Sequence, residues 1–72
     1  MTINTNEKKI INRATLRAYR AAHRITQDVF AKRLGMTMFS YARSESGYRQ
    51  FSENEIAEII KQTGLTYAQL TE

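Results

Sequence analysis

The sequence has no cysteine and no proline, and its single histidine is His23. Without cysteine the chain cannot form a disulfide, a thiolate zinc site or a cysteine nucleophile. One histidine cannot build a metal site by itself, so we expect neither a metal nor another cofactor. Paired inward carboxylates are also missing, and no set of residues suits acid–base or nucleophilic catalysis. We therefore expect a protein that is not an enzyme and has no small-molecule substrate.

Long apolar runs are absent as well. Near the N-terminus only Ile10 and Ile11 stand between Lys9 and Asn12, which is too short for the apolar region of a signal peptide. No apolar run approaches the roughly 20 residues that span a membrane. These absences predict a soluble cytoplasmic protein with no membrane partner.

The charge of the chain is unevenly distributed. Residues 1–49 contain ten basic and three acidic residues, a net charge of +7, whereas residues 50–72 contain one basic and four acidic residues, a net charge of −3. A basic body suits a polyanion such as DNA. An acidic end suits a basic protein, so the charge pattern leaves both kinds of partner open.

The 72 residues provide room for one small domain with one core, and no alternating pattern of a strand occurs. Residues 1–11 are polar, which predicts a flexible N-terminal arm before a domain at residues 12–72. The first predicted helix covers about residues 13–23. The next two begin at the capping residues Thr26 and Thr37 and end at glycines 35 and 47. A fourth begins at Ser52, which forms a capping box with Glu55, and ends at residue 64, before a short helical turn that starts at residue 66.

Apolar spacing along these helices predicts the core. The expected core residues are Leu16, Tyr19, Val29, Phe30, Leu34, Ile56, Ile59 and Ile60, with Leu65 and Leu70 closing the core.

Residues 25–47 form two short capped helices that meet at a glycine-containing turn, with Glu-x-Gly at the end. Over about residues 14–70 the chain resembles the Cro and lambda-repressor-like helix-turn-helix family. The matching residues are Arg20, Thr26, Gln27, Ala31, Leu34, Gly35, Thr37, Glu45, Gly47, Leu65, Thr66 and Leu70. The resemblance implies an all-α, compact five-helix domain and an ion pair between Arg20 and Glu45.

The resemblance also implies a mode of DNA binding. The third helix would enter the major groove and read bases, while Gln27 would hold a phosphate. Further phosphate contacts are implied for Arg43, Tyr48, Arg49 and Gln50. The chain departs from this pattern at Met38 and Phe39, which cannot read a hydrogen-bond code. Either these two residues face outward, or they are core residues of a shifted helix. Tyr41 and Ser44 also stand where the family usually packs aliphatic or bulky apolar residues inward.

Two functions follow from these observations. The first is an antirepressor in the genetic switch of a temperate phage, acting in the bacterial cytoplasm by binding a phage repressor, with DNA bound weakly or within the complex. Its expected partner-binding residues on the third helix are Thr37, Met38, Phe39, Tyr41, Ala42 and Arg43. An acidic partner surface is expected at Glu53, Glu55 and Glu58. The alternative is a Cro-type repressor that binds operator DNA directly with its third helix.

Overall fold

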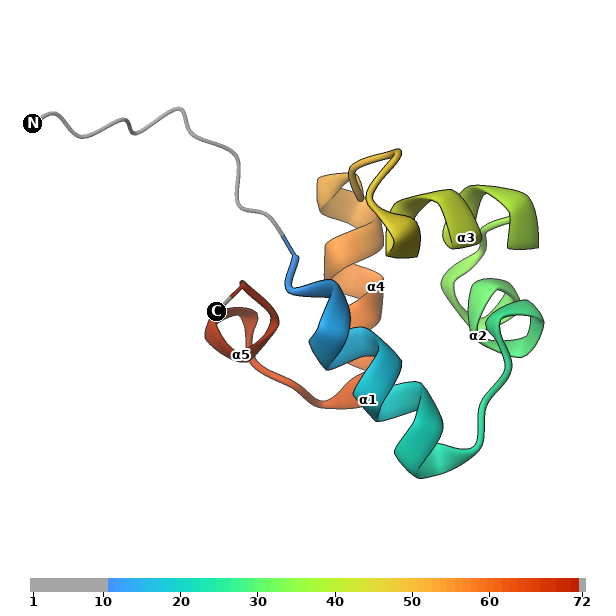
Figure 1. The fold of residues 1–72 in the computed structure, drawn as a ribbon. Helices are drawn as coiled ribbons and strands as arrows, with labels where there is room; N and C mark the ends of the chain where they lie inside the picture. The colour runs from blue at the N-terminus through green and yellow to red at the C-terminus, as the bar shows by residue number, and fades with distance from the viewer. Residues whose placement is uncertain (1–10, 72) are drawn as a thin grey trace, which may run out of the picture.

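A computed structural model describes residues 11–71, which fold into five helices without a strand (Figure 1). The helices are α1 (Arg13–His23), α2 (Gln27–Leu34), α3 (Met38–Ser46), α4 (Glu53–Thr63) and α5 (Tyr67–Thr71). The prediction of a compact all-α domain is therefore confirmed. Residues 1–10 of the predicted arm, which was expected to cover residues 1–11, lie outside the described residues.

Local signals set most of the helix ends. The hydroxyl oxygens of Thr26, Thr37 and Ser52 accept hydrogen bonds from the backbone N–H three residues later, and the predicted capping box of Ser52 and Glu55 is complete. The glycines that end α2, α3 and α4 have φ angles of 76°, 96° and 76°, in the left-handed region that glycine adopts without strain. The predicted ends of these helices are confirmed.

The residues that cap the two ends of α1 were not predicted from the sequence. The Asn12 side-chain oxygen accepts hydrogen bonds from the backbone N–H groups of Ala14 and Thr15. At the other end Arg24 adopts a left-handed conformation with φ 57°. The backbone N–H of Asn12 also donates to the Leu70 carbonyl at 2.6 Å, which joins the start of α1 to α5.

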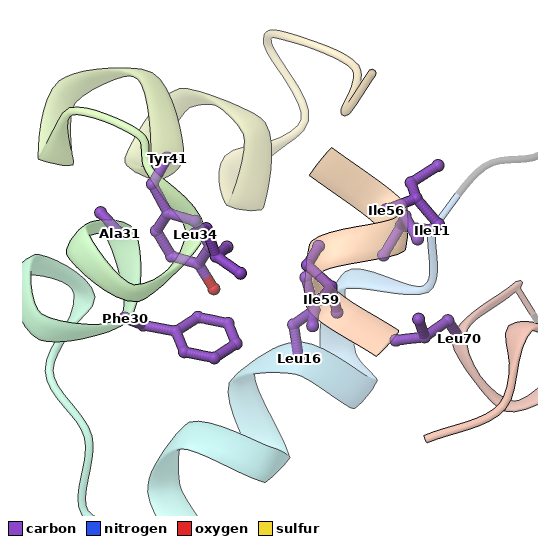
Figure 2. Packing of buried hydrophobic residues seen from close by; sticks show 9 residues of the cluster. All are labelled: Ile11, Leu16, Phe30, Ala31, Leu34, Tyr41, Ile56, Ile59 and Leu70. Atoms are coloured by element: carbon purple, nitrogen blue, oxygen red, sulfur yellow. The ribbon is translucent and has the colours of Figure 1, made fainter. Parts of the chain in front are cut away.

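The core lies where α1, α2, α3 and α4 meet, and Leu70 of α5 completes it (Figure 2). Its buried apolar residues are Ile11, Leu16, Phe30, Ala31, Leu34, Tyr41, Ile56, Ile59 and Leu70. The ring of Phe30 meets that of Tyr41 edge to face, with 5.5 Å between the ring centroids, and so fixes α3 against α2. Ala31 is fully buried on α2, which packs against α3.

Two core predictions are wrong. Val29 is 41% exposed, because the inward stripe of α2 is formed by Phe30, Ala31 and Leu34, and Val29 lies about 100° around the helix from Phe30. Ile11, which we assigned to the arm, is buried in the core. Of the other predicted core residues, Tyr19, Ile60 and Leu65 are partly buried and pack against the cluster.

None of the five helices within residues 11–71 has the length and apolarity needed to cross a membrane. The same residues contain no group of histidine, aspartate and glutamate side chains arranged to hold a metal ion.

Candidate functional site

The two sides of α3 differ in exposure. Tyr41, Ser44 and Glu45 are buried against the rest of the domain. Met38 and Phe39 in the first turn are 50% and 71% exposed, and Arg43 one turn later is exposed as well. The interpretation of Met38 and Phe39 as core residues of a shifted helix is therefore wrong.

Glu45 is the centre of the buried side, and only 3% of its side chain is exposed. Its carboxylate accepts two hydrogen bonds of 2.8 Å from Nε and Nη2 of Arg20, one of 2.8 Å from Nε2 of Gln27, and one from the Tyr41 hydroxyl. The predicted ion pair between Arg20 and Glu45 is present. It joins α1, the start of α2 and α3 through a single carboxylate.

These contacts decide the charge of the buried groups. Burial alone would raise the pKa of the Glu45 carboxyl, but the hydrogen bonds from Arg20, Tyr41 and Gln27 outweigh burial and lower that pKa below its ordinary value. Burial and the hydrogen bond to Glu45 raise the pKa of Tyr41. The hydrogen bond with Glu45 also raises the pKa of Arg20. Glu45 is thus ionised in the folded protein, with Tyr41 as a neutral donor.

Two predicted contact residues lie in this buried network. Tyr41 has no exposed surface, so the prediction that it contacts a partner is wrong; its ring fills the core, and its hydroxyl binds Glu45. Gln27 is half-buried, and its side-chain N–H donates to Glu45. The phosphate contact of Gln27 stays a prediction.

A second ion pair joins the loop after α3 to the start of α4. Nη1 of Arg49 donates to the buried Ser44 hydroxyl at 2.7 Å and to Oε1 of Glu55 at 2.9 Å, while Nη2 lies 2.8 Å from Oε2 of Glu55. The hydrogen bond from Arg49 lowers the pKa of Glu55. Arg49 was expected to bind a phosphate and Glu55 to face a partner protein. In the structure the two side chains form an ion pair with each other.

The remaining predicted residues lie on different parts of the surface. Glu53 and Gln50 are exposed, and Glu58 is half-buried with a hydrogen bond from Gln62. Thr37 caps α3, and Ala42 is half-buried.

The exposed side of α3 continues into the following loop. Tyr48, directly after Gly47, is 77% exposed. The guanidinium carbon of Arg43 lies 5.7 Å from the ring centroid of Phe39 and 5.9 Å from that of Tyr48. We call Met38, Phe39, Arg43 and Tyr48 the α3 patch. The sequence showed its apolar pair but not the placement of Tyr48 beside Arg43, which a positive φ at Gly47 makes possible.

The α3 patch has the chemistry of a contact surface rather than of a reaction centre. It combines exposed apolar side chains, which lose unfavourable contact with water when a partner covers them, with one cation. Its four residues include no carboxylate, histidine, serine or cysteine that could act as a general base or nucleophile.

Comparison with known proteins identifies the arrangement of α2 and α3. Residues 13–72, well over half of the chain, match a family model described as a helix-turn-helix domain. No curated protein and no solved structure matches the chain.

Proposed function

Because the chain belongs to the helix-turn-helix domain family, we propose that it regulates transcription as an antirepressor, which binds a repressor protein through the α3 patch and prevents or alters its binding to the operator. A helix-turn-helix domain indicates DNA-binding transcription regulation, and the family is typically non-enzymatic. The antirepressor function is a narrower proposal than transcription regulation. We propose that it acts in the genetic switch of a temperate phage.

The exposure of Met38 and Phe39 is the observation that carries this proposal. In a helix-turn-helix the first turn of the recognition helix, which is α3 in this chain, reads the bases. Reading bases requires hydrogen-bond donors and acceptors. Met38 and Phe39 provide none. Burying each side chain against a partner would contribute about 1.5–3 kcal/mol. Methionine and aromatic residues are also enriched in protein interfaces.

Fewer acidic residues of α4 are free to face the repressor than the sequence predicted. Glu55 is held by Arg49, which leaves Glu53 and Glu58 as acidic groups that a basic repressor surface could approach. Such groups affect the rate and orientation of encounter more than affinity.

The test is a titration of duplex DNA from the control region beside this chain's gene. Fluorescence anisotropy is recorded with this protein alone, with the repressor encoded beside it alone, and with both. We expect weak binding by this protein alone that falls steeply with salt, tight binding by the repressor, and loss or alteration of that binding when both are present. An unchanged repressor–operator titration in the presence of this protein contradicts the proposal.

A double substitution locates the surface. Met38→Ser with Phe39→Ser should abolish binding to the purified repressor while changing the free energy of unfolding by about 0.5 kcal/mol or less, because both side chains are exposed. Tyr67→Ser is the matched control, since Tyr67 is 42% exposed on α5, away from α3 (Figure 1). If the double variant still binds the repressor, the interface lies elsewhere, and Glu53 and Glu58 are the next residues to replace.

Direct operator binding is the second candidate, and Arg43 favours it. Arg43 is exposed on α3, and arginine is the side chain that most often reads guanine. Tight, sequence-selective binding by this protein alone at physiological salt would establish the Cro-type function and remove the antirepressor one.

A further inference from the structure

Arg43 lies beside two aromatic rings, and no carboxylate within residues 11–71 forms an ion pair with it. Phe39 precedes it by four residues, one helical turn away on the same side of α3. Tyr48 is brought to it by the turn at Gly47, where the backbone N–H of Tyr48 donates to the Arg43 carbonyl at 2.9 Å. The centroids of both rings lie within 6 Å of the guanidinium carbon, which is the range of cation–π contacts.

The hydrogen-bonding capacity of this guanidinium is unused within residues 11–71. The ion pairs there join Arg20 to Glu45, Lys32 to Asp28 and Arg49 to Glu55. Aromatic rings contact the flat faces of a guanidinium, whereas its five N–H groups point outward in its plane. Arg43 therefore lies beside Phe39 and Tyr48 on the surface, and no hydrogen bond or ion pair within residues 11–71 occupies its N–H groups.

We infer that Arg43 binds a carboxylate of the partner repressor, at the rim of the apolar pocket that receives Met38 and Phe39. This inference rests on the proposed function and names the chemistry that the partner must present. A carboxylate accepts two parallel hydrogen bonds from one guanidinium, and a partner covering the two rings would exclude water from the pair. Tyr48 is a positioning residue, because its ring orients Arg43.

The charge of the patch favours a carboxylate over the phosphates of DNA. The exposed side chains of α3 are Met38, Phe39, Arg43 and Ser46, and Arg43 is the one cation among them. DNA affinity grows with the number of phosphates that a protein neutralises. A single cation among apolar side chains is complementary to a single acidic residue beside an apolar pocket.

The experiment measures the Kd of the purified repressor for Arg43 variants at low and high salt. We expect Arg43→Gln to weaken binding by about tenfold or more at low salt and to flatten its salt dependence, because the charged pair is lost. Arg43→Lys should bind with intermediate affinity, since lysine keeps the charge but not the planar fork. Arg33→Gln, which removes an exposed cation from α2, is the matched control and should bind like the parent.

Two further measurements test whether Tyr48 orients Arg43 and whether Arg43 pairs with one carboxylate of the repressor. Tyr48→Ala should weaken binding severalfold and Tyr48→Phe should not, because the ring orients Arg43. When exposed acidic residues of the repressor are replaced by amides, one replacement should reproduce the effect of Arg43→Gln and add nothing to it in a double-mutant cycle. Melting temperatures equal to that of the parent show that the variants are folded.

Three results would overturn the inference. If Arg43→Gln binds the repressor with the affinity and salt dependence of the parent, the carboxylate contact is absent, while the antirepressor proposal stands or falls on Met38 and Phe39. If Arg43→Gln weakens binding to duplex DNA alone, the ligand of Arg43 is a phosphate. If the parent protein does not bind the repressor at all, both proposals fail.

Discussion

The inner and outer sides of α3 each pair an aromatic residue with a charged residue four positions later. On the inner side Tyr41 and Glu45 are buried, and the Glu45 carboxylate accepts four hydrogen bonds. On the outer side Phe39 and Arg43 are exposed, and the guanidinium lies beside the rings of Phe39 and Tyr48 without an ion pair to any residue of the range 11–71. Among the residues that the structure describes, no buried side-chain nitrogen or oxygen lacks a hydrogen-bond partner.

The same spacing therefore produces two different results. Tyr41 and Glu45 are buried with all their hydrogen bonds formed, and they connect α1, α2 and α3. Separating Glu45 from Arg20 would leave a buried charge without a partner. Exposure leaves the outer pair with unused binding capacity. A helix of nine residues thus supports the fold with one side and presents a contact surface with the other.

The largest expected effect is on the inner side. Glu45→Gln removes the charge that Arg20 requires and should lower the free energy of unfolding by about 3–5 kcal/mol. That is a large part of the stability of a small domain. Urea unfolding followed by circular dichroism measures the loss. Glu53→Gln, on an exposed glutamate, is the control and should change stability by about 0.5 kcal/mol or less. Equal stability of the two variants would show that Glu45 does not join the helices.

A pair of tyrosine substitutions compares the two sides directly. Tyr41→Phe keeps the ring in the core but removes a hydrogen bond to a buried carboxylate, which should cost about 1.5–3 kcal/mol. Tyr48→Phe removes a hydroxyl from an exposed ring and should leave stability unchanged. Thermal melts of both variants beside the parent test this difference. Similar losses in the two variants would contradict the distinction between the sides.

Acid should progressively remove the stability that the paired carboxylates of Glu45 and Glu55 contribute. The folded-state pKa values of Glu45 and Glu55 lie below the unfolded value of about 4.3. Their contribution to stability is therefore fully present above that unfolded pKa and is lost as pH falls through the lower folded values. The melting temperature should be nearly constant from neutral pH down to about pH 5 and should decrease below about pH 4.

The Glu53→Gln variant should follow the same acid curve as the parent, because Glu53 is exposed and the ion pairs within residues 11–71 do not include it. Arg49→Gln should show a smaller decrease below about pH 4, since Glu55 then loses the partner that depresses its pKa. A parent melting temperature that does not change in acid would contradict the role of these carboxylates.

The predicted residues differ in how far the sequence alone could place them. Met38 and Phe39 were expected to face outward because Thr37 caps the helix just before them, and a cap sets the position of the first turn. Tyr41 was assigned to the same partner-binding surface of the third helix, although the family packs an apolar residue inward at this position. Its direction depends on the rotation of α3 against Phe30, which no local pattern specifies. The family resemblance predicted the contact between Arg20 and Glu45, which are 25 residues apart.

The amino-acid sequence by itself determined where the helices lie and most of their ends. Capping hydroxyls and left-handed glycines act on backbone groups within a few residues, so these signals can be read from neighbouring residues. The family resemblance and the outward position of Met38 and Phe39 also came from the sequence.

Only the tertiary structure decided which long-range partners meet. It placed Ile11 in the core and Val29 outside it, joined Arg49 to Glu55, and brought Tyr48 to Arg43. These outcomes depend on how the helices pack and turn relative to one another. A side chain that is equally suited to a partner, to DNA or to the interior takes its role from the groups that packing places around it.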